Sequence, residues 1–263
     1  MLAELPAPVR EAVARQTGPV LAVSPIAAGH NSPLSVRLET ALGPLFVKGL
    51  PDASPGRVAT QHREYEISRH LHGVGPRARW QIRTGGWHLV AFDYLNDARH
   101  ADYRPESADL ASIANLLQEV ARLPIPEGVD LRRAEQRLSA YGTGEQLQHV
   151  VGNTLLHTDL NPQNVLLTKD GTARLVDWGW ATLGASWLDA AAWGIWLVAS
   201  GHTPSAAHAW AARLPAYQAA APAARHAYAS MARALWEGIA EASDAPWVSR
   251  VCDAAGAWAA ATS

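Results

Sequence analysis

The chain has 263 residues, of which 48% are apolar, so it is long enough for one large domain or two lobes with a sizeable core. The net charge at pH 7 is -2 and the sequence pI is about 6.6. No basic field therefore exists that would gather nucleic acid or an anionic lipid surface, and we expect neither nucleic acid nor a membrane among the partners.

The sequence also favours a cytoplasmic location. Its longest apolar stretch, residues 187–200, contains Asp189 and is shorter than the ~20 residues that cross a bilayer. The N-terminus has no charged region followed by an apolar run, so we expect no secretory signal. Cys252 is the single cysteine, which excludes an intrachain disulfide and fits a reducing compartment.

Three strands are predicted within residues 18–50, separated by short turns. In the second strand, Leu34, Val36 and Leu38 alternate with polar residues, which is typical of a strand with one buried face. The third strand, LFVKGL, carries Lys48. Because arginine supplies nearly all the positive charge and the chain has only two lysines, we expect Lys48 to serve where a compact ammonium is needed.

A helix is predicted over residues 58–71, and it carries a carboxylate in an unusual place. Glu64 shares the helix face of Ile67, whereas a solvated carboxylate lies on the opposite face. We expect Glu64 to be the partner of Lys48, with Glu66 as the alternative if the helix is rotated.

The next segments change from strand to helix. A hairpin with a Gly-Gly turn is predicted over residues 79–95, followed by an irregular connection over residues 96–109. One helix is predicted to begin near Ser107, and a second over residues 131–150 with an interruption at two glycines. After a compact strand-loop-strand segment, the chain is predicted to be mostly helical from Ser186 onward.

A polar cluster lies between two aliphatic runs at residues 155–167. His157, Asp159 and Asn164 form the pattern HxDxxxxN, and Asp177 ends another strand thirteen residues later. A loop carboxylate can orient a substrate hydroxyl and take its proton, while an amide oxygen five residues on can reach a metal on nucleotide phosphates. The carboxylate of Asp177 can hold Mg²⁺, which needs few protein ligands because it keeps several waters. Turn formation alone would explain the first three residues but not Asp177.

This order of residues resembles the protein-kinase-like fold, and the stretch LLHTDLNPQNVLL with the following RLVDWGWA is similar to the aminoglycoside phosphotransferase family of small-molecule kinases. The resemblance is strongest over residues 155–195 and consists of order and spacing over residues 20–100. It implies an α+β, bilobal fold. Residues 1–95 would form a nucleotide-binding lobe with a small antiparallel sheet and one helix, and residues 96–263 a larger, mainly helical lobe with the catalytic loop and the acceptor site.

The resemblance also implies roles for individual residues. Asp159 would be the catalytic aspartate, and Asn164 and Asp177 would bind Mg²⁺. Lys48, paired with Glu64, would bind the phosphates of ATP or GTP.

Further residues follow from the same resemblance. The backbone of Phe92 and Tyr94 would meet the nucleobase, His157 would support the catalytic loop, and Asp189 would anchor its backbone. In two places the chain departs from protein kinases. The first hairpin turn has a single glycine, Gly29, and Asn161 stands where a lysine usual in protein kinases would lie, which argues against a protein substrate.

The acceptor is less constrained by the sequence. The leading class is an antibiotic such as an aminoglycoside or a basic peptide; the alternatives are a metabolic sugar, amino-alcohol or choline-type acceptor, or a non-catalytic nucleotide-binding regulator. Glu237 and Glu241 lie one helical turn apart and could hold an amine, although a solvated helix face is the ordinary interpretation. Among the tryptophans, most of which we expect in the core, Trp178 and Trp180 are the best candidates for stacking on a ring.

Overall fold

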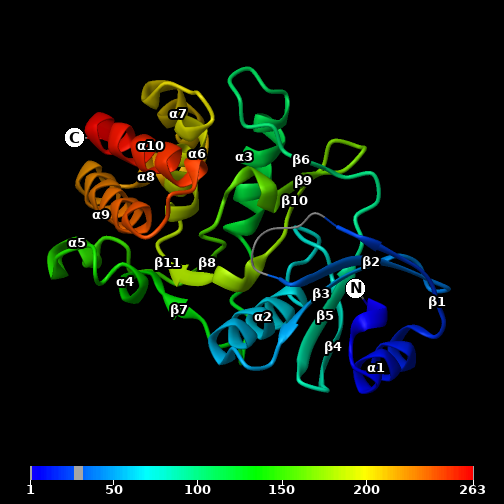
Figure 1. The fold of residues 1–263 in the computed structure, drawn as a ribbon. Coiled ribbons are helices and arrows are strands. Elements are labelled where there is room, and N and C mark those ends of the chain that lie inside the picture. The colour runs from blue at the N-terminus through cyan, green and yellow to red at the C-terminus, as the bar shows by residue number, and fades with distance from the viewer. Residues whose placement is uncertain (1, 27–31, 263) are drawn as a thin grey trace. The chain divides into compact units, whose positions relative to one another are not determined.

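The computed structural model describes residues 2–26 and 32–262 (Figure 1). The chain forms two compact units. One, which we call the sheet unit, contains the chain up to Asp97 together with Asp177–Gly179. The other, the helical unit, contains Ala98–Val176 and the residues from Trp180 onward.

The sheet unit is built on five antiparallel strands in the order β1-β2-β3-β5-β4. All three strands predicted within residues 18–50 are present, and so is the predicted hairpin. The burial of β2 alternates along its whole length, as the spacing of its leucines and valine predicts. The strands are β1 (Val20–Pro25), β2 (Leu34–Thr40), β3 (Leu45–Pro51), β4 (Ala78–Thr84) and β5 (Trp87–Asp93).

The two faces of this sheet pack against different helices. One face buries Val36, Val47 and Ala91 against the N-terminal 3-10 turn η1 (Leu2–Glu4) and helix α1 (Ala7–Thr17). The sequence analysis predicted no helix before residue 18. A proline in the first turn of α1, where a missing N–H costs nothing, helps to start it.

The opposite face packs against helix α2 (Pro55–Ser68), which begins and ends three residues earlier than predicted. Tyr65 of α2 packs against a cluster that includes Phe46 and Phe92. Because side chains alternate along a strand, Lys48 shares the face of Phe46 and not that of Val47. The strand register therefore places Lys48 on the α2 side of the sheet.

The helical unit contains two three-stranded sheets of short strands. In one, β9 lies between β10 and β6, and in the other, β11 lies between β7 and β8. The hairpin β9–β10 is the predicted strand-turn-strand segment after the polar cluster. The strands are β6 (Arg99–His100), β7 (Arg132–Arg133), β8 (Thr154–Leu156), β9 (Val165–Leu167), β10 (Ala173–Leu175) and β11 (Thr182–Gly184).

The prediction of one interrupted helix over residues 131–150 is wrong. The segment contains strand β7 and two short helices, α4 (Ala134–Arg137) and α5 (Gly144–Gln148). β7 pairs in parallel with β11, so Arg132 and Arg133 are in a strand and not in a helix. Thr143 starts α5 anew, because its hydroxyl accepts a hydrogen bond from the N–H of Gln146.

The remaining helices form most of the helical unit, as predicted from residue 186 onward (Figure 1). α10 packs against both α6 and α9. No helix in the described parts of the chain is long and apolar enough to cross a membrane. The helices are α3 (Asp109–Val120), α6 (Leu188–Ala199), α7 (Pro204–Ala211), α8 (Pro215–Ala219), α9 (Pro222–Glu241) and α10 (Pro246–Thr262).

Candidate active site

Lys48 is the centre of a buried charge cluster in the sheet unit. Its Nζ atom forms an ion pair with Glu64 of α2 and lies 3.0 Å from Oδ1 of Asp177. Lys48 and Glu64 are both buried, whereas the Asp177 side chain is 37% exposed. The structure thus brings together three of the residues that the sequence analysis singled out, across a separation of 129 positions.

The choice between Glu64 and Glu66 is also settled by contacts within this unit. Glu66 pairs with Arg69 near the end of α2, at 3.2 Å, while Glu64 pairs with Lys48. The rotation of α2 is therefore the one that the helix face shared with Ile67 predicts.

Burial and charge act on the two partners in opposite ways. Burial by itself lowers the pKa of Lys48, but the carboxylates of Glu64 and Asp177 outweigh it, so the pKa of Lys48 lies above its ordinary value. Burial raises the pKa of the Glu64 carboxyl, and Lys48 counteracts that rise. Lys48 is thus a fixed positive charge.

Asp177 lies just beyond the end of β10 in a backbone conformation that few residues adopt. Its φ is 63°, in the left-handed region that aspartate tolerates better than most residues with a Cβ. The residue before it, Val176, is held on both sides: its N–H donates to the carbonyl of Asn164 at 2.9 Å, and its carbonyl lies 2.9 Å from Nε2 of His157.

In the helical unit, both carboxylate oxygens of Asp159 accept hydrogen bonds from asparagine side chains. Nδ2 of Asn161 donates to Oδ1, and Nδ2 of Asn164 donates to Oδ2, each at 2.9 Å. Asn161 also caps the 3-10 turn η2 (Pro162–Asn164), because its Oδ1 accepts from the N–H of Gln163. The carboxylate is thereby fixed in orientation. The sequence analysis assigned Asn161 no such role, and its position two residues after the aspartate in a turn was the available signal.

The loop that carries Asp159 is anchored from α6. Asp189 is buried and accepts from the N–H of His157 at 2.8 Å and from that of Thr158 at 2.9 Å. Thr158 has a φ of 66°, which is costly for a β-branched residue. The hydrogen bond to Asp189 therefore helps to hold Thr158 in a strained backbone conformation. His157 is fully buried, and its Nδ1 accepts from the N–H of Asp159 at 3.3 Å. Asp189 and His157 thus both contact the backbone of this loop. Their supporting roles remain a prediction.

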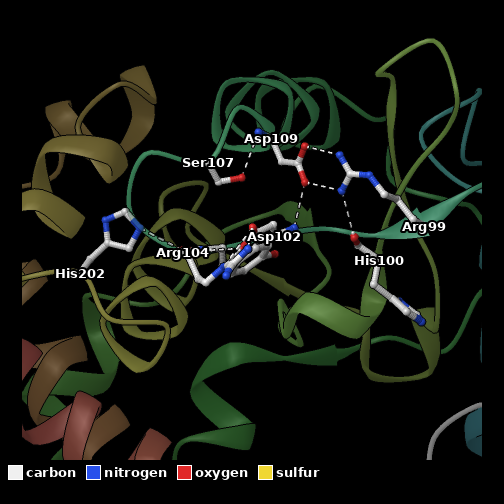
Figure 2. Close-up of polar contacts among 8 residues, drawn as sticks. Arg99, His100, Asp102, Arg104, Ser107, Asp109 and His202 are labelled. Atoms are coloured by element: carbon white, nitrogen blue, oxygen red, sulfur yellow. Dashed lines mark hydrogen bonds and ion pairs between the residues drawn. The ribbon is translucent and has the colours of Figure 1, made fainter.

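A network that the sequence analysis treated as irregular connection fixes the segment after β6 (Figure 2). Both terminal nitrogens of Arg99 donate to Asp109, at 2.6 and 2.7 Å, and Asp109 also accepts from the N–H of Asp102 at 2.9 Å. The carbonyl of Tyr103 lies 2.9 Å from Nε2 of His202.

This network holds a buried phenol near the loop that carries Asp159. Tyr103 packs edge to face on Trp193 with ring centroids 6.4 Å apart, and its hydroxyl has no hydrogen-bond partner among the described residues. Burial raises the pKa of Tyr103, and the Asp159 carboxylate raises it further. The hydroxyl therefore stays protonated beside the loop.

The donor set of the two candidate metal ligands fits Mg²⁺. The Nδ2 atom of Asn164 donates to Asp159, so the amide oxygen of Asn164 points away from the Asp159 carboxylate. An amide oxygen is a hard ligand of the kind that Mg²⁺ prefers. Asp177 offers a partly exposed carboxylate. Within the described residues no group of three or more acidic, histidine or cysteine side chains could hold a metal ion. Mg²⁺ needs few protein ligands because it keeps several waters.

The predicted nucleobase contacts are made by residues already engaged in the sheet. Phe92 of β5 has partners on both neighbouring strands, Phe46 and Ala78. The N–H of Tyr94 donates to the carbonyl of Pro44 at 3.3 Å. A role for their backbone toward a nucleobase remains a prediction.

Three secondary expectations have different outcomes. Trp178 is only 1% exposed and cannot offer a stacking face, whereas Trp180 is 50% exposed and lies under the guanidinium of Arg137. Glu237 is paired with Arg233 on the surface of α9. Gly29 lies outside the described residues.

No protein-family model and no curated protein matches the sequence, but solved structures match it over nearly its whole length. Choline kinase LicA from Streptococcus pneumoniae matches with a TM-score of 0.66 and 14% identity, over 96% of this chain and 98% of that chain. A thermostable mutant of aminoglycoside phosphotransferase APH(4)-Ia matches with a TM-score of 0.63 and 14% identity, over 93% and 97%. Spectinomycin phosphotransferase APH(9)-Ia, in its AMP-bound complex, matches with a TM-score of 0.59 and 11% identity, over 94% and 96%.

These matches confirm the predicted fold class. The protein has a protein-kinase-like fold, with an N-terminal five-stranded antiparallel sheet and helix followed by a mainly helical region, like the aminoglycoside phosphotransferases and choline kinase LicA.

Proposed function

We propose that this chain is a small-molecule kinase that transfers the γ-phosphoryl group of ATP or GTP to a hydroxyl group of its acceptor. The observation that carries the proposal is the buried Lys48, held between Glu64 and Asp177. A lysine so constrained is a preorganised positive charge, which costs no reorganisation when a phosphate approaches it.

The other residues fit the remaining tasks of phosphoryl transfer. Asn164 and Asp177 would hold Mg²⁺, which when bound neutralises negative charge on the phosphates. Asp159 would orient the acceptor hydroxyl and take its proton, and each of its oxygens keeps a lone pair for that purpose beside the bond from Asn161 or Asn164. The backbone of Phe92 and Tyr94 would contact the nucleobase. We place the reaction in the cytoplasm.

The leading acceptor class is an antibiotic such as an aminoglycoside or a basic peptide. The likeness to aminoglycoside phosphotransferases supports this class, since an aspartate-to-alanine variant of a thermostable mutant of APH(4)-Ia forms a ternary complex with ADP and hygromycin B. A kinase of this kind would confer resistance to the antibiotic that it modifies.

A metabolic acceptor, such as a sugar, an amino alcohol or a choline-type compound, is the second candidate. It is favoured by the pairing of Glu237 with Arg233 at 2.7 Å, because a carboxylate already matched by a guanidinium is a poor anchor for a polycation. The likeness to choline kinase LicA supports the same alternative.

The test is acceptor-dependent formation of ADP or GDP across both acceptor classes, in the wild type and in Asp159→Asn. We expect turnover to fall by ~10² or more in Asp159→Asn, because a positioned acid-base group contributes on that scale, while nucleotide affinity stays nearly the same. Asp253→Asn, which removes an exposed carboxylate from α10, is the matched control and should turn over normally.

Two results would contradict the proposal. Full turnover in Asp159→Asn would remove Asp159 from the reaction. Nucleotide binding without turnover on any acceptor, unchanged in Asp159→Asn, would instead favour a non-catalytic nucleotide-binding regulator.

A further inference from the structure

The segment Asp177–Gly179 is held from helix α2 by contacts additional to those of Lys48. Nη1 of Arg63 donates to the carbonyl of Gly179 at 3.0 Å. A Cβ atom on Gly179 would lie 2.6 Å from the Cγ2 methyl of Thr60, closer than carbon atoms approach one another. The glycine therefore lies directly against the helix.

One face of α2 makes all these contacts. Thr60, Arg63 and Glu64 are spaced i, i+3 and i+4, so their side chains lie together on the helix surface. Glu64 pairs with Lys48, which in turn contacts Asp177. The hydroxyl of Thr60 donates to the carbonyl of Gly56 at 3.0 Å, which fixes the rotamer that places its methyl.

We propose that this face of α2 positions the carboxylate of Asp177 for Mg²⁺, and that Arg63 is a positioning residue of the site. The inference rests on the proposed function, in which Asp177 holds the metal. Arg63 fixes one end of the three-residue segment at Gly179, and Lys48 fixes the other end at Asp177. Because α2 is connected to both ends of this segment, the position of α2 determines the position of the Asp177 carboxylate.

The first experiment compares Arg63→Met with Arg69→Met. Both variants remove one guanidinium and keep an unbranched apolar stem, Arg63 within α2 and Arg69 at its C-cap. Among the described residues, the side chain of Arg69 pairs with Glu66 on the surface. Binding of ATP, and in parallel GTP, is titrated at rising MgCl₂. We expect the Mg²⁺ concentration for half-maximal binding to rise about tenfold in Arg63→Met, the scale of one charge-assisted hydrogen bond, and to stay the same in Arg69→Met.

The second experiment uses the close approach at Gly179. Gly179→Ala introduces a methyl that must push the segment away from α2, so the Mg²⁺ requirement should rise by a similar factor. Thr60→Ser removes the opposing methyl and keeps the hydroxyl bonded to Gly56. We expect Thr60→Ser alone to bind nucleotide with the wild-type Mg²⁺ requirement. In the double variant Thr60→Ser/Gly179→Ala, the Mg²⁺ requirement should return toward the wild-type value.

Nucleotide affinity without Mg²⁺ and the melting temperature are measured for every variant. If Arg63 and Gly179 merely stabilise the fold, both quantities fall while the Mg²⁺ requirement of the folded protein stays unchanged. That result would overturn the inference. Asp177→Asn distinguishes this failure from a failure of the proposed function.

Asn keeps the backbone conformation at position 177 and removes the charge. A raised Mg²⁺ requirement in Asp177→Asn, with no change in Arg63→Met and Gly179→Ala, leaves the metal role standing and refutes the role of α2. An unchanged requirement in Asp177→Asn removes the metal role itself, and the inference with it.

Discussion

Lys48 and Glu64 form a buried pair in which each charge depends on the other. Among the described residues, Lys48 is the ion-pair partner of Glu64. Lys48→Met would leave a carboxylate in an apolar environment without a counter-charge, so we expect the free energy of unfolding to fall by about 3 kcal/mol. Urea unfolding at pH 7 measures the change.

The double variant Lys48→Met/Glu64→Leu tests this explanation. It replaces the pair by apolar side chains of similar size, so most of the lost stability should return, while nucleotide binding should be absent in both variants. A double variant as unstable as Lys48→Met would show that the lysine stem, and not the uncompensated charge, stabilises this part of the sheet unit.

At this scale the sequence was informative where residue type and pattern conflict. A lysine in a chain that has only two, and a glutamate on an apolar helix face, were both predictable. Arg63 and Asn161 were not, because arginine is common here and asparagine is ordinary in a turn. Their importance depends on which backbone or carboxylate lies opposite, and that is set by the tertiary fold.

Among the elements, α6 and α10 approach so closely that one glycine decides their packing. A Cβ atom on Gly194 of α6 would overlap the six-membered ring of Trp258 on α10. Gly194→Ala should therefore lower the free energy of unfolding by about 1–3 kcal/mol, the usual cost of overpacking a core. This loss is expected although alanine is the better helix former.

Gly256 provides the control for this prediction. It lies within α10, and a Cβ there would meet no atom within 4 Å. Gly256→Ala should raise the free energy of unfolding by up to about 1 kcal/mol. Thermal or urea unfolding of the two variants compares the same substitution with and without a neighbour, and equal effects at both positions would contradict this account of the helix contact.

The elements that the sequence predicted well are those with a regular apolar period, such as β2 and α3. The segment at residues 131–150 was predicted wrongly because pairing of β7 with β11 and the cap at Thr143 compete with helix formation. Both interactions involve geometry that a single stretch of sequence does not contain. The short strands β6 and β11 escaped prediction for the same reason.

For the molecule as a whole, acidification should weaken the sheet unit through His88. This histidine of β5 is fully buried, and its Nδ1 lies 2.8 Å from Nε2 of Gln61. Burial, with smaller contributions from His62 and Arg83, lowers the pKa of His88 to about 4, whereas the unfolded chain has the ordinary value near 6.5. The stabilising contribution is therefore complete above pH 6.5 and is lost as the pH falls toward 4.

The size of this loss is up to about 3 kcal/mol, the free energy that corresponds to the shift in pKa. We expect the stability difference between the wild type and His88→Asn, measured by urea unfolding from pH 7 to pH 4, to shrink by that amount. The asparagine oxygen can accept from Gln61 as Nδ1 does, and it does not titrate. A difference that is constant across this pH range would show that His88 is not responsible.

The scarcity of lysine has a practical consequence for anyone who labels this protein. Lys48 is enclosed and carries a proton, while the only other lysine, Lys169, lies exposed in a turn. Acylating reagents attack neutral, accessible amines, so the native chain should take up one side-chain adduct, at Lys169, besides any at its α-amino group. A second adduct, at position 48, would appear only in molecules that have opened, and its fraction by mass spectrometry would count them without a spectroscopic probe.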